Sequence, residues 1–212
     1  MDTRSYDLID QGLGEIDRAI KVLSVPARSV RPAPTVPVGD PLRDAQRAES
    51  VRLMRVNHSG EVAAQALYQG QALTAGDAVV SAALRQAASE ENDHLAWCEL
   101  RLRELNGRTS VLNPLWYAGS FAIGALAGAF GRSAGLGFVA ETERQVESHL
   151  RGHIDRLGNA DVRSRAILVE MTHDEMQHGA EAAALGGKEL PFPVGLAMRL
   201  TSRLMTLGSY WL

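Results

Sequence analysis

The chain has 212 residues and a formal net charge of −3, and this length predicts one domain with room for an appended arm. The slight negative charge argues against a protein that binds nucleic acid through a basic surface, so no nucleic-acid partner is expected. The single cysteine, Cys98, excludes a disulfide framework and a metal site of four thiolates.

The first 41 residues are predicted to form an arm. An amphipathic pattern indicates a helix from about residue 6 to residue 23, and its acidic residues are unlike the basic and apolar start of a secretion signal. Five of the eight prolines then fall between Pro26 and Pro41, where they prevent a helix and favour an extended linker. We therefore expect residues 1–41 to be a helix with a proline-rich linker, and residues 42–212 to form the main domain.

The rest of the chain has the pattern of helices separated by short breaks. The predicted helices are 43–74, 77–105, a small-residue helix that starts at Asn113, 138–157, 160–185 and 194–212. Asn113 before Pro114 is expected to cap its helix. Gly135 and Gly137 are expected to bend or interrupt that helix before residue 138. No alternation typical of a strand stands out, so the predicted fold class is all-α.

One pattern of metal-ligand residues occurs twice. A lone glutamate is followed, about one helix later, by a Glu-x-x-His turn. The first copy is Glu61 with Glu91 and His94, and the second is Glu143 with Glu175 and His178. This is the ligand pattern of ferritin-like di-iron bundles. We therefore expect residues 42–212 to be a ferritin-like four-helix bundle with an internal two-fold repeat, accompanied by further apolar or amphipathic helices.

The spacing within each turn has a physical reason. Residues three apart share one face of a helix, so each Glu-x-x-His turn offers a bridging carboxylate and an imidazole to one cavity. Glu61 and Glu143 would each complete one metal ion. A single Glu-x-x-His is common on solvated helix faces, but a duplicate beside apolar residues is not. Four buried carboxylates would be costly without a cation, and this ligand set suits iron or manganese.

Further candidates surround this set, each with a plainer alternative. Glu90 and Asp174 precede the two bridging glutamates, and each could accept a hydrogen bond from the histidine of the opposite helix. The alternative is that both are solvated. His149 follows Glu143 and could relay protons or electrons, or be a surface histidine. Tyr68 could line the pocket, although packing is the simpler interpretation, as it is for Cys98.

Two apolar segments bear on the substrate. Residues 113–139 combine aromatic side chains with many glycines and alanines, and residues 191–212 are amphipathic, with Arg199, Arg203 and the pair Tyr210-Trp211. Both are typical of segments that lie at a membrane surface or line a channel for a lipid. Ordinary bundle core, or an interface between subunits, remains open as an alternative for each.

The motifs NHSGE, EENDH, ETERQVESH and THDEMQHG, from about Met54 onward, resemble the demethoxyubiquinone hydroxylase family. The resemblance implies a peripheral protein on the cytoplasmic face of the cell membrane that binds two iron ions per chain. Its reaction would insert one oxygen atom of O2 into the ring of a polyprenylated methoxy-benzoquinol, with electrons from NADH or a reduced quinol. Other ubiquinone-biosynthesis proteins and a second copy of the chain are implied as further partners.

The resemblance also assigns roles to residues. Glu91 and Glu175 would be the bridging ligands at the reaction centre, and His149 matches a family histidine tied to electron delivery. Leu150 stands next to it where animal members have a tyrosine, so a redox role for that neighbour does not carry over. The arm before about Asp40 is not covered by the resemblance.

Rival functions share the ligand pattern. Ferritin-like iron storage and a manganese catalase would use similar residues, while a rubrerythrin-type peroxidase would need a four-cysteine iron module that the sequence lacks. A membrane-associated scaffold or lipid-binding protein without catalysis is a rival from a different class.

Overall fold

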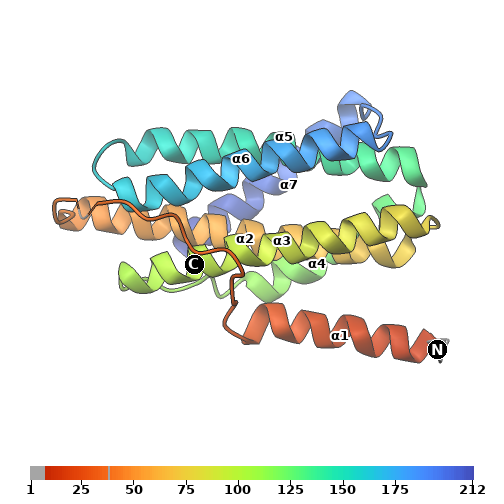
Figure 1. Ribbon diagram of the computed structural model, residues 1–212, viewed down its shortest axis with the longest axis horizontal. Coiled ribbons are helices and arrows are strands. Elements are labelled where there is room, and N and C mark those ends of the chain that lie inside the picture. Colours follow the sequence, from red (N-terminus) through yellow and green to blue (C-terminus); the bar gives the residue numbers. More distant parts are fainter. Residues whose placement is uncertain (1–7, 38) are drawn as a thin grey trace.

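The computed structural model describes residues 8–37 and 39–212, and within them the chain forms helices joined by turns and extended segments (Figure 1). The helices are α1 Leu8–Ser24, α2 Asp44–Thr74, α3 Ala78–Glu104, α4 Asn113–Ala129, α5 Arg132–Leu157, α6 Val162–Ala184 and α7 Phe192–Trp211. The described residues contain no strand, which confirms the all-α prediction. The first helix was predicted to start at about residue 6, and residues 6 and 7 lie outside the described residues.

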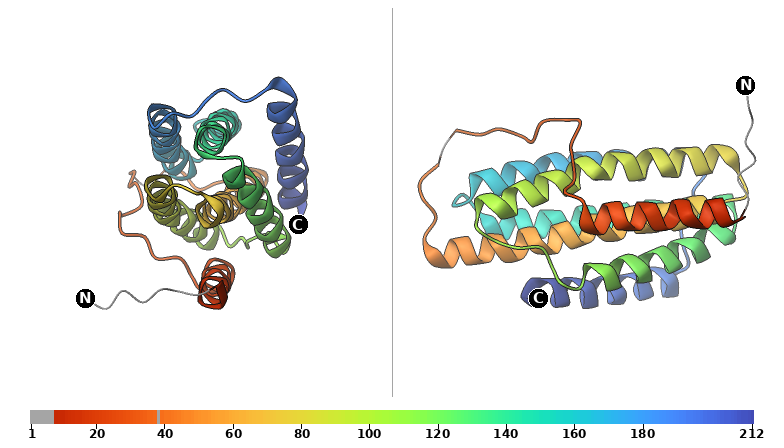
Figure 2. Two further views of the ribbon diagram at one scale, coloured as in Figure 1. Left: turned by 90° about the vertical axis from the view of Figure 1, so that its right-hand side faces the viewer. Right: turned by 90° about the horizontal axis from the view of Figure 1, so that it is seen from below.

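Four of the helices make up a bundle. Helices α2 and α3 form one hairpin and α5 and α6 form the other, and the two hairpins pack face to face (Figure 2). Helix α4 packs along α2, and α7 lies outside the bundle against α2 and α5. Helix α1 lies on the outside, against α2 and α4. The two hairpins are the two copies of the ligand pattern, so the repeat in the sequence is a repeat of hairpins in space.

Local capping explains where two bundle helices begin. The Asp77 carboxylate accepts hydrogen bonds from the backbone N–H groups of Val79 and Val80 at the start of α3. The Asp161 carboxylate accepts one from the backbone N–H of Ser164 at the start of α6. Each supplies an acceptor to an N–H that has no partner within its own helix. Both hairpins therefore turn where the sequence places an aspartate.

The break between α4 and α5 is not where the glycines predicted it. The chain turns at Phe130 and Gly131, and Gly131 has a φ of 90°, which favours glycine. Gly135 and Gly137 lie inside α5 and do not interrupt it, so that expectation was wrong. Gly137 is needed for close packing instead, because a Cβ there would overlap the carbonyl oxygen of Lys188.

The small residues of α4 also serve packing. A Cβ at Gly124 would overlap the carbonyl oxygen of Leu67, and a Cβ at Gly70 would overlap that of Phe121, so α2 and α4 approach closely through glycines. Asn113 is the first residue of α4 and makes no cap, contrary to expectation, because its side-chain oxygen accepts a hydrogen bond from Ser59 Oγ at 2.8 Å. One face of the apolar segment is thus core.

Two of the three hydrophobic clusters among the described residues lie at the two ends of the bundle interior, and the third, which contains Val62, Ala66, Leu95 and Tyr117, joins α2 and α3 to α4. The large-residue cluster contains Leu53, Met54, Trp97, Cys98, Leu102, Leu105, Leu150, Ile154, Leu157, Ile167, Leu168 and Met171. The alanine-rich cluster contains Tyr68, Ala72, Val80, Leu84, Leu136, Val139 and Ala182, with Ala64, Ala75, Ala87, Ala88, Ala140 and Leu185 packed against it. Cys98 is fully buried in the first cluster, which confirms its packing role. Along every bundle helix the predicted metal ligands fall between the two clusters.

Candidate metal centre

All six predicted ligands lie in the interior of the bundle. Helix α2 carries Glu61, α3 carries Glu91 and His94, α5 carries Glu143, and α6 carries Glu175 and His178. Their exposed fractions run from 0% for Glu91 and His94 to 9% for His178. Charged side chains are seldom buried so completely unless they are paired or bind a metal. The structure therefore brings together the full set that the sequence repeat predicted.

The two imidazoles point the same nitrogen into the cluster. His94 Nδ1 lies 2.9 Å from Glu91 Oε2, 3.4 Å from Glu175 Oε1 and 3.5 Å from Glu61 Oε2. His178 Nδ1 lies 3.1 Å from Glu91 Oε1 and 3.9 Å from Glu175 Oε2. Glu91 and Glu175 each face both imidazoles, which is the placement that a shared, bridging carboxylate requires.

The remaining glutamates divide the centre into two halves. Potential ligand atoms of Glu61, Glu91, His94 and Glu175 lie within 4.8 Å of one another, a spacing that a single metal ion could span. The Glu143 carboxyl hydrogen-bonds to Glu175 on the other side and interacts with the charge of His178. We call Glu61 with His94 the His94 half, and Glu143 with His178 the His178 half. Both halves share the two central carboxylates.

The chemistry of this cluster fits a bound cation. Among the described residues, four buried side-chain atoms that lack a hydrogen bond belong to the predicted ligands: Glu61 Oε2, Glu91 Oε1, Glu143 Oε1 and His178 Nδ1. Such atoms are rare in folded proteins and costly unless something satisfies them. Metal ions would meet all four at once, so the residues present fit the group that their pattern implies.

Protonation in the metal-free cluster shows the same need for positive charge. Burial and the neighbouring carboxylates raise the pKa of Glu61 and of Glu143 well above the usual value. Burial would lower the pKa of both imidazoles, but their hydrogen bonds to carboxylates and the charge of Glu91 outweigh it. The pKa of His94 is raised well above its usual value, and that of His178 is raised to about 11. In the metal-free cluster, protons on these side chains thus offset the negative charge of the carboxylates, which bound metal cations could also do.

Each imidazole is oriented from behind by an acidic residue of the opposite hairpin. His94 Nε2 lies 2.9 Å from Asp174 Oδ2, and His178 Nε2 lies 3.0 Å from Glu90 Oε2. Because a carboxylate accepts, Nε2 keeps its hydrogen, and Nδ1 is the nitrogen that can bind a metal ion once its own proton has left. This confirms the predicted hydrogen bonds of Glu90 and Asp174, and the Glu90 side chain is at the same time 44% exposed to solvent.

One contact was not foreseen from the sequence. Arg31, in the proline-rich part of the arm, donates from Nη2 to Asp174 Oδ2 at 2.5 Å and from Nε to Asp93 Oδ2 at 3.0 Å. The arm therefore reaches the carboxylate that orients His94. The repeat could not reveal this contact, because Arg31 lies outside both copies and no spacing rule links it to them.

His149 lies on α5, about two helical turns after Glu143, and outside the set of six. Its ring centroid lies 3.9 Å from that of His153, whose Nδ1 is 2.8 Å from Asn57 Oδ1. Burial, with the nearby charge of Arg156, lowers the pKa of His149 to about 4, so this imidazole is neutral at physiological pH. Its expected part in electron delivery stays a prediction.

Two polar groups on α2 lack partners on the alanine-rich side of the centre. Gln65 and Tyr68 follow Glu61 by about one and two helical turns, and they are 3% and 1% exposed. Gln65 Nε2 and the Tyr68 hydroxyl are buried without a hydrogen bond among the described residues. Tyr68 packs in the alanine-rich cluster, as its plainer interpretation predicted, but its hydroxyl is left unsatisfied.

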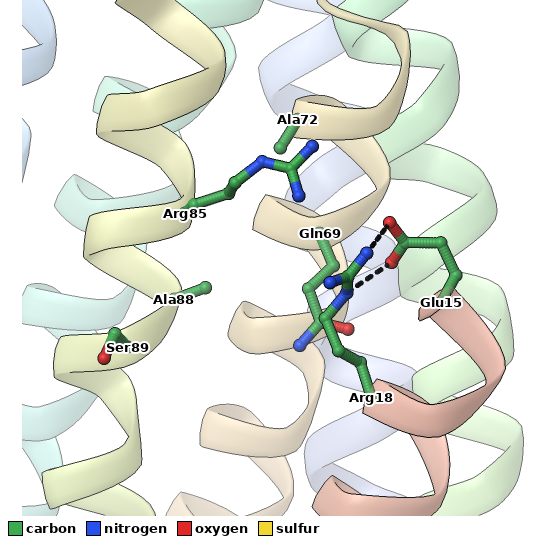
Figure 3. Close-up of a pocket in the computed structure, with 7 residues that line it drawn as sticks. All are labelled: Glu15, Arg18, Gln69, Ala72, Arg85, Ala88 and Ser89. Carbon is green, nitrogen blue, oxygen red and sulfur yellow. Dashed lines mark hydrogen bonds and ion pairs between the residues drawn. The ribbon is translucent and has the colours of Figure 1, made fainter. Parts of the chain in front are cut away.

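A separate pocket of about 280 Å³ lies between α1 and the bundle (Figure 3). Its lining residues are Glu15, Arg18, Gln69, Ala72, Arg85, Ala88 and Ser89. Glu15 and Arg18 are paired with each other at its edge, with Arg18 Nε 3.0 Å from Glu15 Oε2. None of the six predicted ligands lines this pocket.

Comparison with known proteins places these features in a family. The model of the family "Ubiquinone biosynthesis protein COQ7" matches residues 48–209. A 3-demethoxyubiquinol 3-hydroxylase of Nitrosospira multiformis is 54% identical, with 96% of this chain and 98% of that protein covered. The corresponding protein of Azoarcus is also 54% identical, with 96% and 99% covered.

A solved structure supports the fold independently. The dodecameric thioferritin of Bacteroides fragilis, a bacterioferritin-related protein, superposes with a TM-score of 0.55 at 19% identity. The superposition covers 64% of this chain and 83% of the thioferritin chain. At that identity the likeness concerns the fold alone, and it confirms the predicted ferritin-like bundle.

Proposed function

Since the chain belongs to the ubiquinone biosynthesis protein COQ7 family and is a 3-demethoxyubiquinol 3-hydroxylase, we propose that it works as a monooxygenase at a centre of two iron ions. The observation that carries the proposal is the cluster of six ligands, in which both imidazoles face both central carboxylates. Four carboxylates and two imidazoles are a donor set that suits iron. One ion would lie in the His94 half and the other in the His178 half.

Iron bound there would supply the reduction of O2 that ring hydroxylation requires. The chain's own residues do the rest. Glu91 and Glu175 face both imidazoles and would help to hold both ions, and Asp174 and Glu90 keep the imidazoles turned with Nδ1 inward. The large-residue cluster closes one end of the centre against water. Electrons from NADH or a reduced quinol would enter from outside, and we propose that His149 takes part in their delivery.

We propose that the quinol ring approaches from the alanine-rich side. The side chains on that side of the centre are smaller than those of the large-residue cluster on the other side. The polar groups that we propose to bind the quinol ring are Gln65 Nε2 and the Tyr68 hydroxyl. Both lack a hydrogen bond within the chain, so a quinol oxygen would satisfy them. The prenyl tail would continue among apolar side chains.

We also propose that the protein works as a peripheral protein on the cytoplasmic face of the cell membrane. Helices α4 and α7 lie on the same flank of the bundle (Figure 2), and this flank exposes large apolar residues, among them Leu126 at 63%, Phe130 at 79%, Leu204 at 68% and Trp211 at 62%. Within the described residues no helix has the length and apolarity to cross a bilayer. An amphipathic surface of this kind suits binding at a lipid interface.

Vesicle binding tests the membrane proposal. The full chain should co-sediment with vesicles of anionic phospholipid, and Leu204→Glu should reduce the bound fraction severalfold. Val169→Glu, on α6 away from this flank (Figure 2), exposes the same charge at a half-exposed position and should bind as the wild type does. If Leu204→Glu leaves vesicle binding unchanged but converts a dimer to a monomer, the flank is a subunit interface and the membrane proposal is wrong.

Turnover with labelled O2 tests the di-iron proposal. Iron-loaded protein, given reductant and 3-demethoxyubiquinol, should yield a product heavier by one labelled oxygen atom. Glu91→Ala should form no product, because it removes a carboxylate that both halves share. Glu181→Ala, which changes an exposed glutamate on α6, is the matched control and should retain activity. Two bound irons without any labelled product would favour storage or peroxidase chemistry instead.

A further inference from the structure

The arm is fixed to the bundle at its proline-rich segment. After α1 the chain runs in an extended course beside α3 and on to the start of α2 (Figure 1). The backbone N–H of Val30 donates to Asp93 Oδ1 at 2.6 Å, and Trp97 Nε1 donates to the carbonyl oxygen of Arg31 at 3.1 Å. Asn92 Nδ2 donates to the carbonyl oxygen of Arg28 at 2.6 Å. Backbone atoms of the arm are thus bound by side chains of one face of α3.

These contacts deliver one side chain to a defined place. The Arg31 guanidinium lies over the Trp97 ring, 5.0 Å from its centroid, and is 3.0 Å from Asp93 through Nε. Its two Nη atoms both reach Asp174, at 3.3 Å to Oδ1 and 2.5 Å to Oδ2. Arg31 therefore joins α3 to α6 with the paired geometry that a guanidinium makes with a carboxylate.

Asp174 has a second partner on its other side. Its Oδ2 atom accepts from His94 Nε2 at 2.9 Å, while His94 Nδ1 faces Glu91 at 2.9 Å. Asp174 is 13% exposed in its side chain, so without Arg31 it could turn towards solvent and leave His94 without its acceptor. A continuous path of two contacts, Arg31 to Asp174 and Asp174 to His94, runs from the arm to the imidazole that carries the ligand nitrogen.

We propose that Arg31 is a positioning residue of the metal centre, which holds Asp174 and through it sets the orientation of His94. The arm is then a functional part of the enzyme, since its docking completes the His94 half. The inference rests on the proposed metal centre. Arg31 should therefore affect how tightly the protein retains the metal ions proposed above.

Metal binding by the full-length, metal-free protein is the direct test. Fe²⁺ is added anaerobically, and the bound metal is measured by equilibrium dialysis. The wild type should bind two ions per chain. Arg31→Ala should lose about tenfold or more in affinity for one of the two, the size of effect typical for a residue that orients a ligand. Arg31→Lys keeps the charge but not the paired geometry, so its loss should be intermediate.

Arg28→Ala is the matched control. It removes the same charge from the same segment, but only the backbone of Arg28 contacts α3, and its side chain is exposed. It should bind both ions as the wild type does. The double variant Arg31→Ala with Asp174→Asn should bind no more weakly than Asp174→Asn alone, because both changes break the same path.

The outcomes separate the possibilities. Arg31→Ala that binds both ions with wild-type affinity would overturn the inference, and so would additive losses in the double variant. If the metal-free Arg31→Ala protein has a much lower melting temperature than the wild type, the Arg31→Lys variant decides the question. Wild-type iron affinity in Arg31→Lys would count against a positioning role for Arg31. If the wild type itself binds no iron, the proposed function fails, and that failure is distinguishable from these.

Discussion

His94 and His178 occupy equivalent positions in the two Glu-x-x-His turns, yet their surroundings differ. His94 is fully buried, and its acceptor Asp174 is held by Arg31 and is 13% exposed in its side chain. His178 is 9% exposed, and its acceptor Glu90 is 44% exposed in its side chain and accepts from Gln86 at 2.8 Å. The repeat supplies the same ligands twice, but one half is sealed and the other lies near solvent.

The neighbours of the two histidines account for the difference. The residue before His94 is Asp93, which accepts from the arm, whereas the residue before His178 is the exposed Gln177, which donates to Glu181. One turn after His94 stands Trp97, which lies under the Arg31 guanidinium. The arm can therefore dock on only one of the two copies. A non-repeated segment makes a symmetric ligand set asymmetric.

The largest effect should come from removing what both halves share. Glu175→Ala deletes a central carboxylate that faces both imidazoles, so bound iron should fall from two ions per chain towards none and turnover should become undetectable. Metal analysis after desalting measures this. Retention of one tightly bound ion would show that Glu175 serves only one half, and the claim that both halves share this carboxylate would be wrong.

A smaller effect should separate the two orienting acids. Asp174→Asn should weaken metal binding in the His94 half by about 10–100-fold, since a buried imidazole loses its charged acceptor. Glu90→Gln should cost less than tenfold, because water can reach His178 and replace the lost acceptor. Equilibrium dialysis of both variants gives the two affinities. Equal losses would mean that burial does not distinguish the halves.

Acid should weaken metal binding in both halves. The pKa of His178 is raised to about 11 and that of His94 is also raised, so in the metal-free protein at neutral pH both imidazoles are positively charged, with a proton on each ring nitrogen. Binding must displace these protons, and affinity should therefore rise with pH by up to about tenfold per unit for each proton released. Titrations between about pH 6 and pH 8, with proton release followed by an indicator dye, measure this. An affinity independent of pH would show that the imidazoles are already neutral.

The smallest effect is expected at Gln86. Gln86→Ala removes the neutral donor to Glu90 on an exposed helix face, and metal affinity should change by no more than about twofold. The same measurement on Arg31→Ala should show about tenfold or more. A large effect at Gln86 would mean that the His178 half depends on its outer contact as the His94 half does.

Much of the centre could be predicted from local rules. The i, i+3 spacing of a helix places Glu91 with His94 and Glu175 with His178, and the duplicate pattern identified all six side chains that the structure brings together. The same reasoning anticipated the hydrogen bonds of Glu90 and Asp174, because the residue before a bridging glutamate faces the opposite hairpin. These features follow from helix geometry and from one way of packing two hairpins.

The errors have a common cause. Gly135 and Gly137 were expected to bend or interrupt the helix that starts at Asn113, and Asn113 was expected to cap it, from their intrinsic preferences. The structure uses Gly137 for close contact with Lys188, and it uses the Asn113 side chain for a hydrogen bond with Ser59. In each case a distant segment, which no local rule includes, decided the role of the residue.

The sequence by itself determined the fold class, the repeated hairpin and the six glutamates and histidines that come together in the bundle interior, since each depends on periodicity within one helix and on the cost of burying charge without a cation. Only the tertiary structure decided which half of the centre is sealed. Arg31 meets Asp93 from 62 residues away and Asp174 from 143 residues away. Contacts at such separations depend on how the whole chain is packed, and a proline-rich stretch gives no periodic signal of where it will dock.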